Sequence, residues 1–347
     1  MLTTKSPVEE DRHLLEVAFY EQPFYFSYSS LSRLLMSPNI FYKEYVLQEK
    51  EIRLGKHLLN GTLIHFLLLE GNNFADHFIV TPEALPSDNC VLIAKEMYEV
   101  YKSRIKENPA LNLELVDFSD EIDLMMTNVN YYQNIKDKDK RVAKVVEPKT
   151  EAYFEFLKSA STKDIIDSTM LDKATLAVER IKANEAICEL LGMNRDADGN
   201  TFGVYNELPV QMESDEHPFG FKGIIDNMTI DVSKKQININ DFKTSGKGLA
   251  EFSDTVEYWK YWLQATVYIK LAKEFFKDVI KDDPSWRIDF RFIVFDNYDQ
   301  LYAFPVTLDT LQIWELKFRK AIEGAEYHYT SKDFTLPYDF AVGNVKL

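Results

Sequence analysis

Apolar residues recur at helical spacing through most of the first 190 positions. Between residues 54 and 70 they are dense enough to predict a helix that is buried on most faces, and this helix carries His65. Serines followed by a leucine-rich run predict an earlier helix that begins at Ser29 or Ser30. Amphipathic helices are expected over three further ranges: residues 89–106, 121–133 and 164–191.

Strand patterns replace the helical spacing after residue 200. Alternating apolar and β-branched residues predict three successive strands, over residues 201–212, 219–231 and 236–243. Short polar turns separate them, so an antiparallel meander is expected. A helix over 255–277 and a strand over 287–295 follow, and the last helix is expected over 308–325. The pattern predicts an α/β fold with a central mixed sheet, flanked by helices and extended by a helical insertion.

Composition is that of a globular protein. Of 347 residues, 46% are hydrophobic and 28% are charged. Cys90 and Cys188 lie far apart and belong to no C-x-x-C pair, which disfavours a disulfide framework, a structural zinc site and a four-cysteine iron–sulfur cluster. The first residues are polar, and no apolar stretch approaches the roughly 20 residues that a membrane helix needs. We therefore expect a cytoplasmic protein.

A net charge of −16 opposes binding to nucleic acid unless basic side chains gather locally. Basic residues do cluster, at residues 50–57, at residues 136–144, and at Lys243 with Lys247. A run of charge is more often a solvated face than a binding surface. Carboxylates gathered around a metal ion would also add to the acidic count.

Acidic residues stand near the ends of two neighbouring predicted strands. Asp226 follows Gly223-Ile224-Ile225, and the next strand ends in Asp241-Phe242-Lys243. A turn between the strands can bring both carboxylates to the same edge of the sheet. Because residues two apart in a strand point the same way, Asp241 and Lys243 share a face. Two carboxylates and an ammonium are thus expected to converge.

This combination of groups suits the hydrolysis of a phosphodiester. Carboxylate oxygens hold Mg²⁺, which polarises the phosphate and acidifies a bound water. Lys243 is expected to orient or deprotonate the attacking water and to offset the developing negative charge. Partial desolvation lowers the pKa of an ammonium, which leaves the role of general base open for this lysine.

The ordered set of motifs resembles the PD-(D/E)XK nucleases. Asp226 with Asp241-Phe242-Lys243 is similar to their D…(D/E)-x-K signature, in which Glu often stands where this chain has Asp241. Three further motifs resemble the branch that contains RecB-type, lambda-type and RecE-type exonucleases. They are Gly61-Thr62-Leu63-Ile64-His65 for the G-x-x-x-H helix, Gln264-Ala265-Thr266-Val267-Tyr268 for the Q-x-x-x-Y helix, and Glu207 on the first core strand. Residues 29–38 resemble the entry helix of the RecE-type exodeoxyribonuclease VIII family.

The resemblance implies a fold and a set of site residues. It implies a restriction-endonuclease-like core and one nuclease domain over residues 1–347. Its parts would be entry helices (27–80), a mainly helical insertion (90–195), a catalytic core (200–295), and a C-terminal strand, helix and tail (296–347). The implied metal ligands are His65, Asp226, Asp241 and the carbonyl of Phe242. The implied catalytic residues are Asp226, Asp241, Lys243 and Gln264, and the implied DNA-binding residues are Thr244, Ser245, Lys247 and Tyr268. Glu207 would be an accessory acid.

The function that the resemblance implies is a Mg²⁺-dependent exonuclease that hydrolyses linear duplex DNA, with Mn²⁺ able to substitute and no iron–sulfur cluster. It would act in phage or bacterial recombination or repair, as a homo-oligomer and beside a single-strand annealing protein. Two alternatives stay open. One is a flap nuclease or endonuclease of the same fold, and the other is a catalytically inactive module that binds DNA or protein.

Taken singly, each motif also has a purely structural interpretation. His65 in an apolar helix is more often a hydrogen-bonded core histidine than a ligand. Asp241 with Lys243 is also typical of an exposed pair on an edge strand. Gln264 and Tyr268, at i and i+4, are also typical of a polar pair between packed elements. The aromatic run Tyr258, Trp259, Tyr261 and Trp262 is expected to pack in the core rather than to stack on a base.

Overall fold

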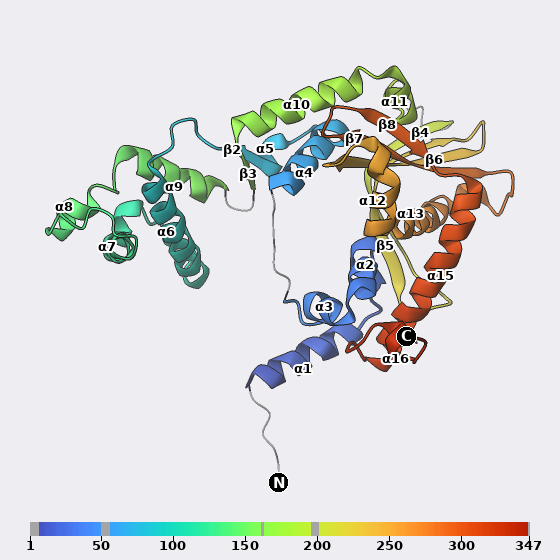
Figure 1. The fold of residues 1–347 in the computed structure, drawn as a ribbon, viewed down its shortest axis with the longest axis horizontal. Coiled ribbons are helices and arrows are strands. Elements are labelled where there is room, and N and C mark those ends of the chain that lie inside the picture. Colours follow the sequence, from blue (N-terminus) through green and yellow to red (C-terminus); the bar gives the residue numbers. More distant parts are fainter. Residues whose placement is uncertain (1–6, 50–55, 161–162, 196–200, 346–347) are drawn as a thin grey trace, which may run out of the picture. The chain divides into compact units, whose positions relative to one another are not determined.

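The computed structural model describes residues 7–49, 56–160, 163–195 and 201–345. The chain forms two compact units (Figure 1), one made of residues 1–70 and 177–347 and the other of residues 71–176. The boundaries expected for a helical insertion at 90–195 stay a prediction. Within the described part of the chain, no helix is both long and apolar enough to cross a membrane.

The first unit is built on a mixed sheet. The predicted meander is confirmed as β4 (Phe202–Met212), β5 (Gly220–Asp231) and β6 (Gln236–Ser245), which pair antiparallel. β7 (Arg287–Asp296) lies parallel to β6, and β8 (Leu301–Pro305) lies antiparallel to β7. The short strand β1 (Tyr25–Phe26) pairs parallel with β5. The expectation of an α/β fold with a central mixed sheet is therefore confirmed.

One edge of β5 is shared between two partners. β4 pairs along the other edge from Phe221 to Asp231, apart from Asp226. On the shared edge, β1 pairs at Gly220 and Phe221, and β6 pairs only from Asn227 to Asp231. Residues 222–226 lie between these two partners. The sheet therefore opens at Asp226, the first residue beyond the ladder with β6.

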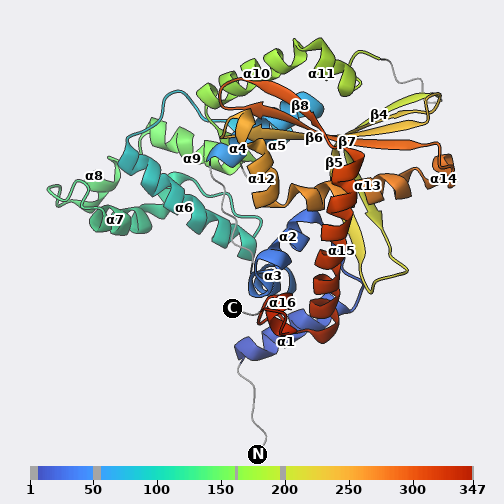
Figure 2. The ribbon, with the colours of Figure 1, turned by 45° about the vertical axis from the view of Figure 1, so that its right-hand side comes forward.

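A central helix, α13 (Tyr261–Phe275), packs against β4, β5 and β7, and α15 (Leu308–Ser331) runs beside it (Figure 2). The residues between them form the main core, which includes Leu263, Val267 and Leu271 from α13 and Phe318 and Ile322 from α15. α4 (Lys56–Leu69), the predicted helix of His65, contacts β6. The other helices of this unit are α1 (Pro7–Tyr20), α2 (Tyr28–Met36), α3 (Pro38–Phe41), the π-helix Tyr42–Val46, α11 (Glu185–Leu190), the 3₁₀-helix Leu249–Glu251, α12 (Phe252–Trp259), α14 (Lys277–Ile280) and α16 (Tyr338–Ala341).

Several predicted boundaries were wrong. The helix predicted over 255–277 is two helices, because Lys260 takes a left-handed backbone conformation (φ 57°) between α12 and α13. The cap of α2 is Ser27, whose side chain accepts a hydrogen bond from the backbone of Ser30, and neither Ser29 nor Ser30 is the cap. Local composition shows that a break or a cap is near, but the tertiary contacts choose its position.

The second unit is mainly helical. Its main helices are α6 (Asp88–Glu107), α7 (Ser119–Asn128) and α9 (Pro148–Ala160), which enclose a small core around Phe118 and Phe154. The range 164–191, predicted as one or two helices, does contain two, α10 (Ser168–Lys182) and α11. It begins with an unpredicted strand, β3 (Asp164–Ile166), which pairs with β2 (Phe78–Val80). The remaining elements are α5 (Phe74–His77), the 3₁₀-helix Leu115–Phe118 and α8 (Lys138–Val142).

The basic cluster at residues 136–144 is partly neutralised by acids within the second unit. Lys138 pairs with Asp120, and Nη2 of Arg141 lies 2.5 Å from Oδ1 of Asp123. These pairs favour a solvated face, the commoner interpretation of such a run. Lys50 and Arg53 of the first basic cluster lie outside the described residues.

Candidate functional site

Two of the predicted acids, Glu207 and Asp226, meet where the sheet opens, whereas Asp241 lies outside their group and pairs with Lys243. β4 and β5 pair on either side of Glu207 and Asp226, through Asn206–Asn227 and Leu208–Ile225, but the Glu207–Asp226 pair itself is missing from the ladder. Glu207 takes a left-handed conformation (φ 47°), which is uncommon for a residue other than glycine and is often found at functional sites. The two acids stand opposite each other at this break.

His65 joins the two acids from α4. Its Nδ1 lies 3.1 Å from Oε1 of Glu207, and its Nε2 lies 3.1 Å from Oδ2 of Asp226. Among the described residues, His65, Glu207 and Asp226 form a group whose ligand atoms all lie within 4.8 Å of one another. Histidine and carboxylate groups at such spacing are suited to holding a divalent metal ion.

Gly61 lets α4 approach the sheet. A Cβ added at Gly61 would lie 2.6 Å from Oγ1 of Thr244 on β6, closer than real Cβ contacts come. A larger residue at position 61 would require the Thr244 hydroxyl to move. His65 lies one turn further along the same helix, so this glycine contributes to the position of the imidazole.

Asp241 and Lys243 form a buried ion pair beside this group. Asp241 is fully buried, and its Oδ2 lies 2.6 Å from Nζ of Lys243. The ammonium also lies 5.0 Å from the centroid of the Tyr261 ring, within the range of a cation–π interaction. Asp241 and Lys243 are therefore not an exposed pair on an edge strand. Phe242 contributes its backbone N–H, which donates to Oδ2 of Asp226 over 2.9 Å.

Burial raises the pKa of two of the acids. The pKa of Glu207 is raised to about 7 by burial, with His65 opposing the rise and Asp226 adding to it. The pKa of Asp241 is also raised to about 7, by burial and by the charge of Asp226 against the opposing charge of Lys243. Closely spaced carboxylates cannot all be ionised cheaply in a buried site. This cluster therefore favours the binding of positive charge.

The pKa values of His65 and Asp226 are instead shifted so that their charged forms are favoured. Burial by itself would lower the pKa of His65, but the hydrogen bond and charge of Asp226 outweigh it and raise the pKa. Burial would raise the pKa of Asp226, but His65 and Lys243 lower it. Both ring nitrogens of His65 face carboxylates, which is the arrangement of a protonated imidazole. A metal ion requires the neutral form, so metal binding and protonation of His65 compete.

The raised pKa of Lys243 is a correction to the sequence analysis. Burial would lower this pKa, but the charges of Asp241 and Asp226 raise it above its usual range. The expected lowering by desolvation is outweighed by the two carboxylates. Lys243 therefore holds its proton beside these acids.

Two buried polar atoms of this site have no partner within the described residues. Oδ1 of Asp241 and Oε1 of Gln264 are buried and accept no hydrogen bond. Leaving such an atom buried without a partner costs about 1–3 kcal/mol, and more when it is charged. Carboxylate and amide oxygens are the ligands that Mg²⁺ prefers. The residues present thus fit a divalent cation.

A ladder of amides lies directly next to the acids in sequence. Asn206, Asn227 and Asn240 stand opposite one another on β4, β5 and β6, each beside one of the acids. Nδ2 of Asn240 donates to Oδ1 of Asn227 over 2.6 Å, and Nδ2 of Asn227 donates to Oδ1 of Asn206 over 2.7 Å. We call these three residues with Arg291 of β7, which donates to Asn240, the amide ladder.

The amide ladder also holds helix ends. Asn206 donates to the carbonyl of Leu69 at the end of α4, and Asn227 and Asn240 donate to the carbonyls of Leu191 and Leu190 beside the end of α11. The last carbonyls of a helix have no partner within the helix, so these amides satisfy them. Sequence reasoning missed this ladder. The recurrence of Asn next to each acid was the available signal.

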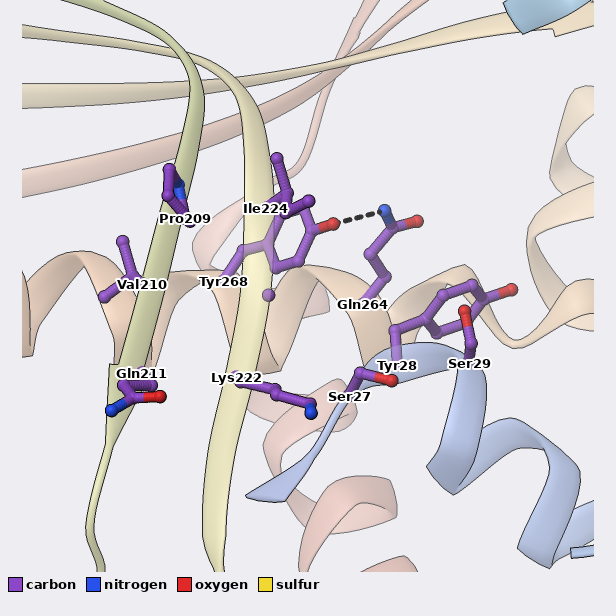
Figure 3. Close-up of a pocket in the computed structure, with 11 residues that line it drawn as sticks. Ser27, Tyr28, Ser29, Pro209, Val210, Gln211, Lys222, Ile224, Gln264 and Tyr268 are labelled. Atoms are coloured by element: carbon purple, nitrogen blue, oxygen red, sulfur yellow. Dashed lines mark hydrogen bonds between the residues drawn. The ribbon is translucent and has the colours of Figure 1, made fainter. Parts of the chain in front are cut away.

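Gln264 and Tyr268 interact on α13. Nε2 of Gln264 donates to the hydroxyl of Tyr268 over 3.1 Å (Figure 3), and both side chains line a cavity of about 780 Å³. Lys222 and Ile224 of β5 and Ser29 of α2 line the same cavity. Gly223 leaves room for the tyrosine, because a Cβ there would lie 2.8 Å from the Tyr268 ring. The predicted pair thus borders the opening in the sheet.

The remaining predicted residues lie around a second cavity. Lys243, Thr244, Ser245 and Lys247 line a cavity of about 420 Å³ at the end of β6. The hydroxyl of Ser245 donates to the carbonyl of Lys247 and accepts from its N–H, so Ser245 caps the turn. Its contacts show this capping role, and the DNA-binding role implied for Ser245 stays a prediction.

Comparison with known proteins does not place the chain in a family. No family model and no curated protein matches the sequence. One similar solved structure is the "putative exonuclease" of Eubacterium rectale, at 11% sequence identity and a TM-score of 0.39, with 93% of this chain and 86% of that chain covered. This likeness is too distant to carry an argument, so the case for a function comes from the site.

Proposed function

We propose that the chain is a Mg²⁺-dependent deoxyribonuclease of the PD-(D/E)XK type. One observation carries the proposal: His65, Glu207 and Asp226 converge from α4, β4 and β5, beside the buried pair of Asp241 and Lys243. Residues more than 140 positions apart meet there, with buried oxygens that lack partners. A structural polar cluster would leave few such atoms unsatisfied.

Asp226, Asp241, Glu207 and His65 would hold the ion. Bound Mg²⁺ supplies Lewis acidity toward the phosphate and lowers the pKa of a coordinated water. Glu207 thus moves from an accessory acid to a proposed ligand, because it lies in the same group as His65 and Asp226. The backbone of Phe242 fixes Asp226 through its N–H, and its carbonyl stays a proposed ligand.

Lys243 would act as an ammonium. Its raised pKa opposes the role of general base, which needs a neutral amine near physiological pH. A protonated Lys243 can orient the attacking water through hydrogen bonds and offset the negative charge that develops on the phosphate. Gln264, whose Oε1 is buried and accepts no hydrogen bond, would orient a water or the ammonium itself.

The substrate we propose is linear duplex DNA, degraded from its ends, with Mn²⁺ able to replace Mg²⁺. Lys222, Lys243 and Lys247 line the two cavities beside the acids and would contact phosphates, together with Thr244 and Tyr268. Local positive charge of this kind can oppose an overall charge of −16. A single-strand annealing protein and further copies of the chain are the proposed partners.

The decisive experiment measures nucleotide release from linear duplex DNA with Mg²⁺, by the wild type and by Lys243→Ala. We expect release by the wild type, a loss on the order of 10²–10⁴-fold in the variant, and partial retention by the matched control Lys243→Arg, which keeps the charge. Absence of release by the wild type, or equal release by wild type and Lys243→Ala, contradicts the proposal.

Closed circular duplex of the same sequence separates the two modes of cleavage. An exonuclease leaves the closed circle intact and degrades it after linearisation. Cutting of the closed circle would identify an endonuclease on the same site. In both cases EDTA is expected to abolish cleavage, and added Mg²⁺ or Mn²⁺ to restore it.

A further inference from the structure

Two large aromatic side chains are exposed on α12. Tyr258 is 72% exposed and Trp259 is 47% exposed, while Phe252 and Val256 of the same helix are buried in the core. The sequence analysis expected the whole aromatic run to pack in the core. That expectation was wrong for Tyr258 and Trp259, and it is confirmed for Trp262, which is buried.

The break after Trp259 accounts for this exposure. The left-handed Lys260 ends α12 and starts α13 in a new direction, so the side chains before it are not carried into the core of α13. The hydroxyl of Tyr28 donates to the carbonyl of Trp259 over 2.6 Å, which fixes this end of α12 to α2. The two rings pack edge to face, 4.8 Å apart. These contacts hold both rings in a defined position on the surface.

These rings face the same cavity as the proposed catalytic lysine. Lys243, Thr244 and Lys247 line one part of the 420 Å³ cavity, and Tyr258 and Trp259 line another. A volume of this size is within the range of small-ligand pockets. A Cβ added at Gly246 would meet nothing, so the turn at the end of β6 leaves open space.

The charged residues around the cavity indicate which chemical groups would bind in it. Lys247 lies 3.8 Å from Glu251 with both side chains mostly exposed, a weak pairing that leaves the ammonium able to bind a phosphate. On α12, Glu257 is paired with Lys317 at 2.8 Å. Phosphates would lie on the β6 side, and an uncharged, flat group would lie on the aromatic side. A nucleotide of a single strand has both parts.

We propose that Tyr258 and Trp259 form a stacking platform for an unpaired base of the DNA strand that runs past the acidic centre, with its phosphate at Lys247 and Thr244. The proposal rests on the proposed function and extends it: the enzyme would hold one strand unpaired beside the site. Stacking on aromatic rings does not depend on base identity, because every base has a π-face.

The test measures binding of a short fluorescent single-stranded oligonucleotide, in Ca²⁺ with absence of cleavage verified. We expect Tyr258→Ala and Trp259→Ala each to weaken binding roughly tenfold, in line with the loss of one stacked base. An oligonucleotide with abasic sites keeps every phosphate and should bind the wild type as weakly as the intact one binds the variants. Phe340→Ala, which removes another exposed ring on α16, is the matched control and should bind normally.

Tryptophan fluorescence gives a second readout. The chain has four tryptophans, and stacking should quench the emission of Trp259 with the intact but not with the abasic oligonucleotide. Trp259→Phe should remove this quenching while it retains most of the affinity. Unchanged binding by Tyr258→Ala and Trp259→Ala, or equal binding of intact and abasic strands by the wild type, overturns the platform. A wild type that cleaves DNA normally alongside either result would leave the nuclease function standing.

Discussion

The acids and the amides of the three central strands are neighbours in sequence, yet their side chains differ in how fully they are hydrogen-bonded. In the amide ladder, Asn206, Asn227 and Asn240 use their side-chain oxygens and nitrogens in hydrogen bonds. One residue away from Asn240, Asp241 keeps a buried oxygen, Oδ1, that accepts none. The fold is therefore able to satisfy polar groups at this depth. Where it leaves a carboxylate oxygen unsatisfied, the missing partner is best explained as a ligand.

The two groups of residues also have opposite effects on the stability of the fold. The amide ladder contributes to the stability of the fold, since it holds the ends of α4 and α11 against the sheet. The acidic centre costs stability, because burial and mutual repulsion raise the pKa values of Glu207 and Asp241. Substitutions on the two sides should therefore have opposite effects on activity and on stability.

The largest effect is expected on the acidic side. Asp226→Asn keeps the volume of the side chain and removes its charge, so metal binding weakens and Mg²⁺-dependent nucleotide release falls by about 10³-fold, a loss of several kcal/mol of transition-state stabilisation. Chemical denaturation in EDTA of a second variant, Glu207→Gln, should show an unfolding free energy no lower than that of the wild type, because burial penalises the charged form of Glu207 and raises its pKa to about 7. A variant that unfolds more easily and still cleaves DNA would reverse the comparison.

On the amide side, Asn240→Ala is expected to lower the unfolding free energy by about 1–3 kcal/mol, because it leaves the Leu190 carbonyl and Oδ1 of Asn227 buried without partners. Urea denaturation measures this loss. Lys320→Ala, which breaks an exposed ion pair with Asp339, is the control and should cost little. Nucleotide release by folded Asn240→Ala should stay within a few-fold of wild type. A loss as large as that of Asp226→Asn would place the ladder in the chemistry.

A smaller effect is expected where α4 meets β6. Gly61→Ala should destabilise the protein by about 1 kcal/mol and weaken metal binding, since the new methyl group meets Oγ1 of Thr244 and pushes His65 away from the acids. Isothermal titration with Mn²⁺ would measure the affinity. Thr244→Ala removes the obstacle, so the double variant should recover the affinity. If the double variant stays as weak as Gly61→Ala, the close contact does not position His65.

The smallest effect is a dependence of stability on pH. Glu207 and Asp241 have pKa values raised to about 7 in the fold, above those of an unfolded chain. Their protonation thus favours the folded state, and this contribution is lost as the pH rises through about 7. In EDTA the melting temperature should fall between pH 5 and pH 8, and Mn²⁺ should raise it most at the alkaline end. Glu207→Gln should flatten the profile, whereas a profile that rises with pH in EDTA would contradict the burial of these acids.

Much of the sheet was predictable from local pattern. The meander β4–β5–β6 and the strand β7 follow from alternation and turn residues, and each was confirmed within a few residues. The short strands β1, β2 and β3 were not recognised, because two or three residues are too few for alternation to show. Their pairing depends on partners far along the chain, as in β1 with β5.

The residues of the site were predictable as types, and their contacts were not. Motif spacing singled out His65, Asp226, Asp241 and Lys243, because a metal-dependent hydrolysis needs those side chains. Whether Lys243 gains or loses proton affinity depends on two opposed effects, burial and neighbouring carboxylates, and only coordinates show how close those carboxylates are. The exposure of Trp259 likewise depends on one backbone conformation at Lys260.

By itself, the sequence determined which chemistry the chain can offer and the strands that carry it, since periodicity and residue type are local properties. The tertiary structure decided that Glu207 stands beside His65, that the amides hold the helix ends, and that the sheet opens at Asp226. Those facts depend on how segments distant in sequence pack together. Burial, repulsion and missing hydrogen-bond partners exist only once that packing is in place.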